Sequence, residues 1–96
     1  MLVLITYDVS TETPAGKKRL RHVAKICTNY GQRVQHSVFE CVLDTAQLRI
    51  VQDKLLKTID NKTDSLRFYM LGNNYKNKVQ HFGAKASFDV TEPLVL

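Results

Sequence analysis

The stretch Leu2-Val-Leu-Ile-Thr-Tyr-Asp-Val9 decides the fold of this chain. It is an almost unbroken run of apolar and β-branched residues, which is typical of a strand covered on both faces in the middle of a sheet. We therefore predict that it forms the central strand and that the other elements pack around it.

The length and composition fit one domain that spans residues 1–96. A chain of 96 residues buries only about two-thirds of its unfolded surface, which allows one two-layer core without a deep internal pocket. Apolar residues make up 44% of the chain, which excludes wholesale disorder. No repeat or Pro/Gly/Ser-rich linker marks a domain boundary.

No apolar stretch reaches the roughly 18 to 20 residues that span a bilayer, and no basic segment precedes the N-terminal apolar run. We expect a cytoplasmic protein without a membrane partner. Cys27 and Cys41 lie in different predicted elements and show no metal-binding spacing, so we interpret both as core thiols in a reducing compartment.

A first helix is predicted to follow a short loop. Thr13 can cap its N-terminus, Pro14 suits the first helical position, and Gly31 suits its end. Its apolar residues recur at helical spacing and predict one buried stripe, made of Leu20, Val23, Ala24, Cys27 and Tyr30.

Residues 32–43 are rich in β-branched and aromatic side chains and predict one strand, or two strands broken near Ser37. Asp44 then caps a second helix, which we expect to end at Asn61. A strand over residues 65–71, a turn at Gly72-Asn-Asn and a weaker extended stretch over residues 76–82 complete the pattern.

This order predicts an α+β fold, a ferredoxin-like βαββαβ sandwich with an extra C-terminal strand and both helices on one face of the sheet. Apolar side chains exceed what two helices cover, and we assign the excess to the open face: Leu2, Leu4, Val34, Val38 and Phe39. We therefore predict a homodimer that packs sheet against sheet. The short apolar tail Leu94-Val-Leu96 is unexplained by this core.

Asp8 is the first candidate for chemistry, because it interrupts an apolar strand at its carboxyl end, where sheets commonly place functional groups. One reading is structural, with Asp8 accepting hydrogen bonds from the loop amides of Ser10 or Thr11. The other is metal binding: one carboxylate is a poor Mg²⁺ site, but two copies of Asp8 across a two-fold axis would form a better one.

The second candidate is a cluster of cations, since residues 1–36 hold six Lys and Arg against two acids within a chain of formal charge +5. Such a cluster favours a polyanion partner, although it is also compatible with a merely solvated helix face. Its members are Lys17, Lys18, Arg19, Arg21 and Lys25, with Arg33 beyond them.

Other residues carry weaker signals. Tyr7 and Phe39 are candidates for base stacking but are more typical of a core. His22, His36 and His81 belong to no nucleophile motif and are assigned surface or hydrogen-bonding roles.

Four segments are informative when they are taken together: LVLITYDV, KKRLRHVAK, NYGQRVQHSVFEC and LGNNYKNKVQHFGAK. They resemble the Cas2 family of small CRISPR-associated adaptation proteins, in its compact I-C-type branch. An apolar strand ending in Tyr-Asp, followed by Arg-x-Arg and Arg-x-Gln-x-Ser-Val-Phe, is a specific combination.

The resemblance implies a ferredoxin-like homodimer in which Asp8 of both protomers binds Mg²⁺ or another divalent cation and supports endonuclease activity. It places Tyr7, Arg19, Arg21, Arg33, Ser37 and Phe39 on the family motif as substrate-orienting or structural groups. It also implies that the dimer bridges two dimers of the Cas1 integrase on duplex DNA during spacer acquisition, with the segment of about residues 84–96 pairing with a neighbouring chain.

Two alternatives stay open. The chain can be a non-catalytic DNA-binding scaffold, in which the basic helix binds phosphates and Asp8 only organises its loop. A toxin-like endoribonuclease is the other alternative, on fold analogy alone. The sequence does not distinguish RNA, single-stranded DNA and duplex DNA as substrates.

Overall fold

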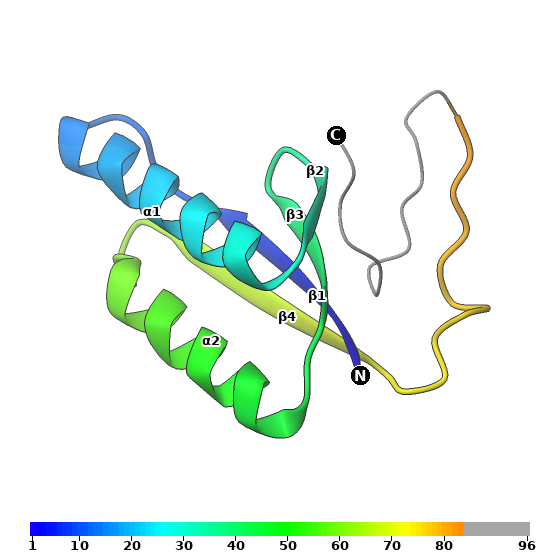
Figure 1. Cartoon of the computed structure of the whole chain (residues 1–96). Coiled ribbons are helices and arrows are strands. Elements are labelled where there is room, and N and C mark those ends of the chain that lie inside the picture. Colours follow the sequence, from blue (N-terminus) through cyan, green and yellow to red (C-terminus); the bar gives the residue numbers. More distant parts are fainter. Residues whose placement is uncertain (84–96) are drawn as a thin grey trace.

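The computed structural model describes residues 1–83, which form a four-stranded sheet and two helices in the order β-α-β-β-α-β (Figure 1). The elements are β1 (Leu2–Asp8), α1 (Pro14–Tyr30), β2 (Gln32–Gln35), β3 (Val38–Val42), α2 (Thr45–Thr58) and β4 (Ser65–Gly72). The expected α+β order is confirmed.

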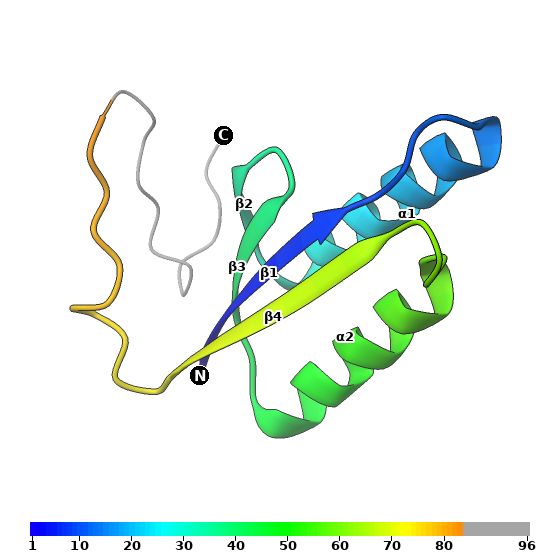
Figure 2. The ribbon, with the colours of Figure 1, turned by 180° about the vertical axis from the view of Figure 1, so that it is seen from behind.

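The sheet has the strand order β2-β3-β1-β4, so the stretch that opens the sequence is an inner strand, as predicted. It pairs antiparallel with β3 on one side and with β4 on the other. Both helices lie on the same face of this sheet, in front of it in Figure 1 and behind it in Figure 2, which leaves the other face without a helix.

The core fills the space between sheet and helices. Alternate residues of β1 point into it, because side chains alternate across a strand: Val3, Ile5 and Tyr7 are all buried. Opposite them, α1 contributes Val23 and Cys27 of its predicted stripe, and α2 contributes Leu48, Val51 and Leu55.

Cys27 and Cys41 are free and buried in this core, as expected. Burial raises the pKa of both thiols to about 12, so they stay protonated near neutral pH. They therefore act as small apolar side chains rather than as nucleophiles or metal ligands.

The helix ends confirm the capping signals. The Thr13 hydroxyl accepts a hydrogen bond from the Gly16 amide, and Pro14 occupies the first turn. Asp44 and Gln47 form a reciprocal capping box at the start of α2. Gly31 ends α1 in extended backbone, and its role is close approach: an added Cβ would lie 2.4 Å from the Cys41 sulfur and from the Glu40 carbonyl.

Three expectations need correction. Helix α2 ends at Thr58, before Asn61, because Ile59 adopts extended backbone. Residues 76–82 form a turn and irregular backbone instead of an extended strand, so the described part of the chain contains no extra C-terminal strand. The predicted pairing of residues 84–96 with a neighbouring chain lies outside the described residues.

The third correction concerns the open face. Phe39 is fully buried on the helix side of β3, so its assignment to the open face is wrong. The error arose because Val38 and Phe39 are adjacent and cannot share a face of one strand. Leu4 and Val38 remain half-buried there, whereas Leu2 is buried and Val34 lies at a bulge in the edge strand β2.

No helix within residues 1–83 is both long and apolar enough to cross a membrane.

Candidate functional site

Asp8 is the last residue of β1 and lies on the sheet face that the helices leave open. Its position follows from alternation, since its neighbours Tyr7 and Val9 are both in the core. The Asp8 side chain is exposed and has no hydrogen-bond or ion-pair partner among residues 1–83. A carboxylate in this state is free to bind a cation.

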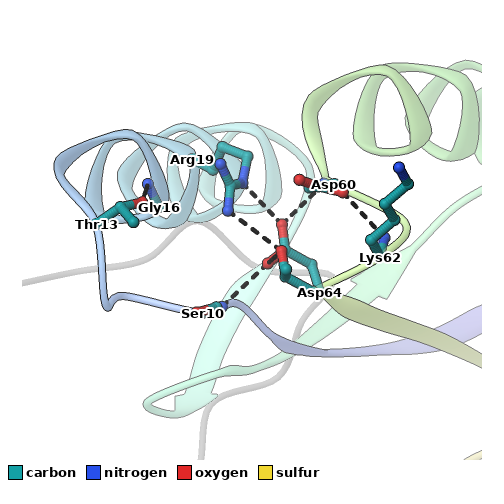
Figure 3. Close-up of polar contacts among 8 residues, drawn as sticks. Ser10, Thr13, Gly16, Arg19, Asp60, Lys62 and Asp64 are labelled. Atoms are coloured by element: carbon teal, nitrogen blue, oxygen red, sulfur yellow. Dashed lines mark hydrogen bonds and ion pairs between the residues drawn. The ribbon is translucent and has the colours of Figure 1, made fainter.

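The structural reading of Asp8 as the organiser of its loop is wrong. The amide of Ser10 donates its hydrogen bond to Asp64 Oδ1 at 3.0 Å, and Asp8 accepts none from this loop. Asp64 therefore organises the loop between β1 and α1 (Figure 3).

The end of β1 is held by the turn between β2 and β3. The Tyr7 amide donates to the Ser37 carbonyl at 3.2 Å, and the Tyr7 hydroxyl donates to the His36 carbonyl at 3.5 Å. The Tyr7 and Phe39 rings stack with their centroids 6.2 Å apart. These contacts bring Tyr7, Ser37 and Phe39 together beneath Asp8, and both aromatic rings are core residues rather than exposed stacking surfaces.

Two of the candidate arginines have partners inside the protein. The Arg33 guanidinium lies over the Phe39 ring, 5.0 Å from its centroid, while the residue stays exposed. Arg19 is more firmly held, because its Nε donates to Asp64 Oδ2 at 2.9 Å in an ion pair.

The remaining cations of α1 face solvent. All four are exposed and none has a partner within the described residues: Lys17, Lys18, Arg21 and Lys25. They leave a row of uncompensated positive charge on the outer surface of α1, which is the arrangement that attracts phosphates.

Sequence reasoning missed Asp64, the most extensively hydrogen-bonded side chain of this region. Its side chain is 0% exposed, and it accepts from the Ser10 and Asp60 amides, the Arg19 guanidinium and the Thr63 hydroxyl. Desolvation raises the pKa of its carboxyl, but these hydrogen bonds outweigh it and lower the pKa from 3.8 to about 2. Asp64 lies in a polar loop that reads as an ordinary turn, so no spacing signal marked it.

The open face of the sheet mixes apolar and polar groups. Thr6 and Leu4 of β1 face it, flanked in register by Arg67 and Tyr69 of β4, whose side chains share a hydrogen bond of 3.3 Å. On the other side of β1, Glu40 of β3 lies beside Leu4, and burial raises the pKa of the Glu40 carboxyl.

The donor set for a metal within one chain is small. No group of three or more His, Cys, Asp or Glu side chains within the described residues is placed to hold a metal ion. The free Asp8 carboxylate fits a hard divalent cation as one oxygen ligand, so further ligands must come from water, from substrate phosphates or from a second protomer.

Comparisons with known proteins agree on one family. The profile of the family described as "CRISPR associated protein Cas2" matches residues 1–79. The chain is 61% identical over 95 residues to "CRISPR-associated endonuclease Cas2" of Halalkalibacterium halodurans, covering 99% of both chains. It is 59% identical over 96 residues to "CRISPR-associated endoribonuclease Cas2" of Chlorobaculum tepidum, covering 100% of both.

A solved structure matches as well. The crystal structure of Streptococcus pyogenes Cas2 at pH 6.5 superposes with a TM-score of 0.75 and 59% identity, covering 86% of this chain and 100% of that one. Because the match extends over nearly the whole sequence and over the fold, the chain belongs to the Cas2 family of CRISPR-associated proteins.

Proposed function

We propose that this protein is a metal-dependent endonuclease that cleaves phosphodiesters of DNA or RNA and takes part in CRISPR adaptation. One observation carries the proposal: Asp8 is exposed and has no partner within residues 1–83, at the end of a strand that Tyr7, Ser37 and Phe39 hold in place. The relatives named as endonuclease and endoribonuclease support nuclease activity, and we extend it to this chain.

In the proposed mechanism, the carboxylate of Asp8 binds Mg²⁺ or another divalent cation. The bound ion would act as a Lewis acid and would lower the pKa of a water molecule bound to it. Arg21 and Arg33, whose guanidinium groups have no carboxylate partner among the described residues, would neutralise charge on the phosphate. Arg19 is less suited to substrate contact because Asp64 already holds it, so we assign it a structural part.

The working unit in this proposal is a homodimer that packs the two open sheet faces together. The helix-free face and its half-buried Leu4 and Val38 favour a second copy of the chain as the occupant. Such a dimer places two copies of Asp8 near the two-fold axis, which supplies the second carboxylate that one chain lacks. Sedimentation equilibrium checks this step, and a stable monomer at micromolar concentration would contradict it.

We further propose that the dimer bridges Cas1 integrase dimers on duplex DNA during spacer acquisition, as expected from family membership. The exposed cations of α1 support this part, because the dimer would present two such rows of positive charge. The I-C-type branch and the pairing of residues 84–96 with a neighbouring chain belong to the same proposal.

The direct test measures cleavage of matched RNA, single-stranded DNA and duplex DNA by purified protein in Mg²⁺ and in EDTA. Cleavage should need the divalent cation and should be lost in Asp8→Asn, with the oligomeric state unchanged. Asp53→Asn is the matched control, since Asp53 is an exposed carboxylate of α2 whose ion pair is with Lys57. Undiminished cleavage by Asp8→Asn would contradict the proposed catalytic role.

A non-catalytic scaffold is the second candidate, favoured by the four exposed cations of α1 that have no partner in the described part of the chain. In that case, reversing the charges of Lys17, Lys18 and Arg21 abolishes spacer acquisition while Asp8→Asn does not. Cleavage confined to RNA would instead favour the toxin-like endoribonuclease.

A further inference from the structure

The Asp64 cluster joins the loop after β1 to the loop before β4 (Figure 3). We define it as Asp64 with Ser10, Arg19, Asp60 and Thr63, whose groups donate to the Asp64 carboxylate. Asp64 Oδ1 receives the Ser10 amide at 3.0 Å and the Thr63 hydroxyl at 3.1 Å. Asp64 Oδ2 receives Arg19 Nε at 2.9 Å and the Asp60 amide at 2.8 Å.

The placement of these groups relates directly to Asp8. Ser10 follows Asp8 by two residues, and Ser65, which follows Asp64, is the residue of β4 paired with Asp8. One carboxylate thus fixes the loop that leaves β1 and the start of the strand beside it. Without this link, the loop after β1 would keep, within the described residues, only the side-chain hydrogen bond at its far end, where the Thr13 hydroxyl caps α1.

The Asp64 side chain is shielded from solvent and accepts hydrogen bonds at both carboxylate oxygens. Its side chain is 0% exposed, and all four hydrogen bonds reach an anion, the class of hydrogen bond that is shorter and stronger than a neutral one. A buried carboxylate with this many donors is costly to leave half-satisfied, so its loop conformation is closely specified.

We propose that Asp64 is a positioning residue for the metal-binding carboxylate, acting through Ser10 and β4 to orient Asp8. The proposal rests on the proposed function, because it assumes that Asp8 binds a divalent cation. Asp64 itself touches neither the ion nor the substrate. Groups that orient a metal ligand typically change metal affinity by about 10- to 100-fold when removed.

The test uses direct Mn²⁺ binding to the full-length protein, followed by electron paramagnetic resonance, so that it does not depend on cleavage. Wild type should bind Mn²⁺ through Asp8, and Asp8→Asn should abolish this binding. Asp64→Asn keeps the shape of the side chain but loses its charge, and it should bind Mn²⁺ about 10-fold or more weakly.

A milder variant covers the case in which Asp64→Asn fails to fold. Thr63→Val removes only the exposed hydroxyl, which donates to Asp64 and accepts from Arg19 Nη2 at 3.4 Å. Thr63→Val should also weaken Mn²⁺ binding, but by a smaller factor than Asp64→Asn. Asp60→Asn is the matched control, because the Asp60 side chain lies in the same loop and, within residues 1–83, accepts a hydrogen bond only from the Lys62 amide.

A second measurement separates positioning from general loss of structure. Affinity for nucleic acid in EDTA reports the exposed cations of α1, and positioning predicts that it stays within about twofold of wild type in Thr63→Val. A parallel fall in both affinities would contradict positioning. If Asp64→Asn and Thr63→Val both bind Mn²⁺ as tightly as wild type, the positioning role of Asp64 is overturned and the proposed function is not. If the wild-type protein shows no Mn²⁺ binding that depends on Asp8, the proposed function is overturned as well.

Discussion

At the scale of single residues, two aspartates in neighbouring parts of the fold have opposite environments. Asp8 is exposed and has no partner among residues 1–83, whereas the side chain of Asp64 is shielded from solvent and accepts four hydrogen bonds. The first environment leaves a carboxylate available to a ligand, and the second fixes a carboxylate inside the protein. The difference separates a candidate ligand from a structural group, although both are the same residue type.

The environment of Asp64 predicts how stability depends on pH. Its pKa is about 2 in the folded protein against 3.8 as the ordinary value, so its contribution is complete above pH 3.8 and is lost as the pH falls toward 2. Asp64→Asn should therefore lower the free energy of unfolding by roughly 2–3 kcal/mol near pH 7, and the difference from wild type should shrink in acid. Urea unfolding followed by circular dichroism between pH 2 and 7 measures it.

The control for this prediction is Asp53→Asn, which removes an exposed carboxylate in a surface ion pair. It should change stability by less than about 1 kcal/mol throughout. A difference between wild type and Asp64→Asn that stays constant down to pH 2 would contradict the assigned pKa.

Gly31 gives a second prediction at this scale, based on contact rather than on backbone strain. An added Cβ would lie 2.4 Å from both the Cys41 sulfur and the Glu40 carbonyl, closer than real contacts allow. Gly31→Ala should therefore lower the free energy of unfolding by about 1–3 kcal/mol through overpacking. Thermal unfolding of Gly31→Ala and of the double variant Gly31→Ala/Cys41→Ala measures this effect. The double variant relieves the contact with the sulfur but keeps the contact with the carbonyl. A Gly31→Ala variant as stable as wild type would refute the close approach.

At the scale of elements, α1 divides into a buried stripe and a charged outer face. Val23 and Cys27 pack in the core, while Lys17, Lys18 and Arg21 are exposed without partners within the described residues. Arg19 belongs to neither set, because its ion pair with Asp64 joins α1 to the loop before β4. The helix therefore combines a packing role with a free cationic surface.

The free cations of α1 predict a salt-dependent affinity for nucleic acid. Replacing Lys17, Lys18 and Arg21 by Ala should weaken binding and reduce the slope of log K against log salt by up to about 0.9 for each lost phosphate contact on duplex DNA. Lys54 and Lys57 of α2 provide the control, because each already has a partner in Tyr30 or Asp53. An unchanged slope in the α1 variant would show that the phosphates bind elsewhere.

The elements also show how far the sequence alone leads. The central strand, both helix caps and the buried stripes were predictable, because periodicity and capping are local signals. The prediction of an extended stretch over residues 76–82 was wrong, since the alternation of apolar and polar residues there is weak and no strand in the described residues pairs with it. The Asp64 cluster could not be predicted for another reason: it joins residues 54 positions apart in the chain, and no local sequence pattern indicates that contact.

At the scale of the whole molecule, one sheet face is covered by helices and the other holds Asp8. Within the described residues, Asp8 is the one carboxylate at the end of β1 on that face, because Glu40 lies beside Leu4, four residues back along β1, and no group of three metal-binding side chains is present. A site that needs two carboxylates must then be shared between copies of the protein. The central claim is thus that the metal site exists only where two protomers meet.

Mixed dimers test this claim most directly. Wild-type and Asp8→Asn chains are unfolded, mixed in varied ratios and refolded together, and Mg²⁺-dependent cleavage is measured against the fraction of wild-type chains. A shared site predicts activity that rises as the square of that fraction, because only dimers with two wild-type chains are complete. A linear rise would show that each protomer holds its own site and would contradict the account.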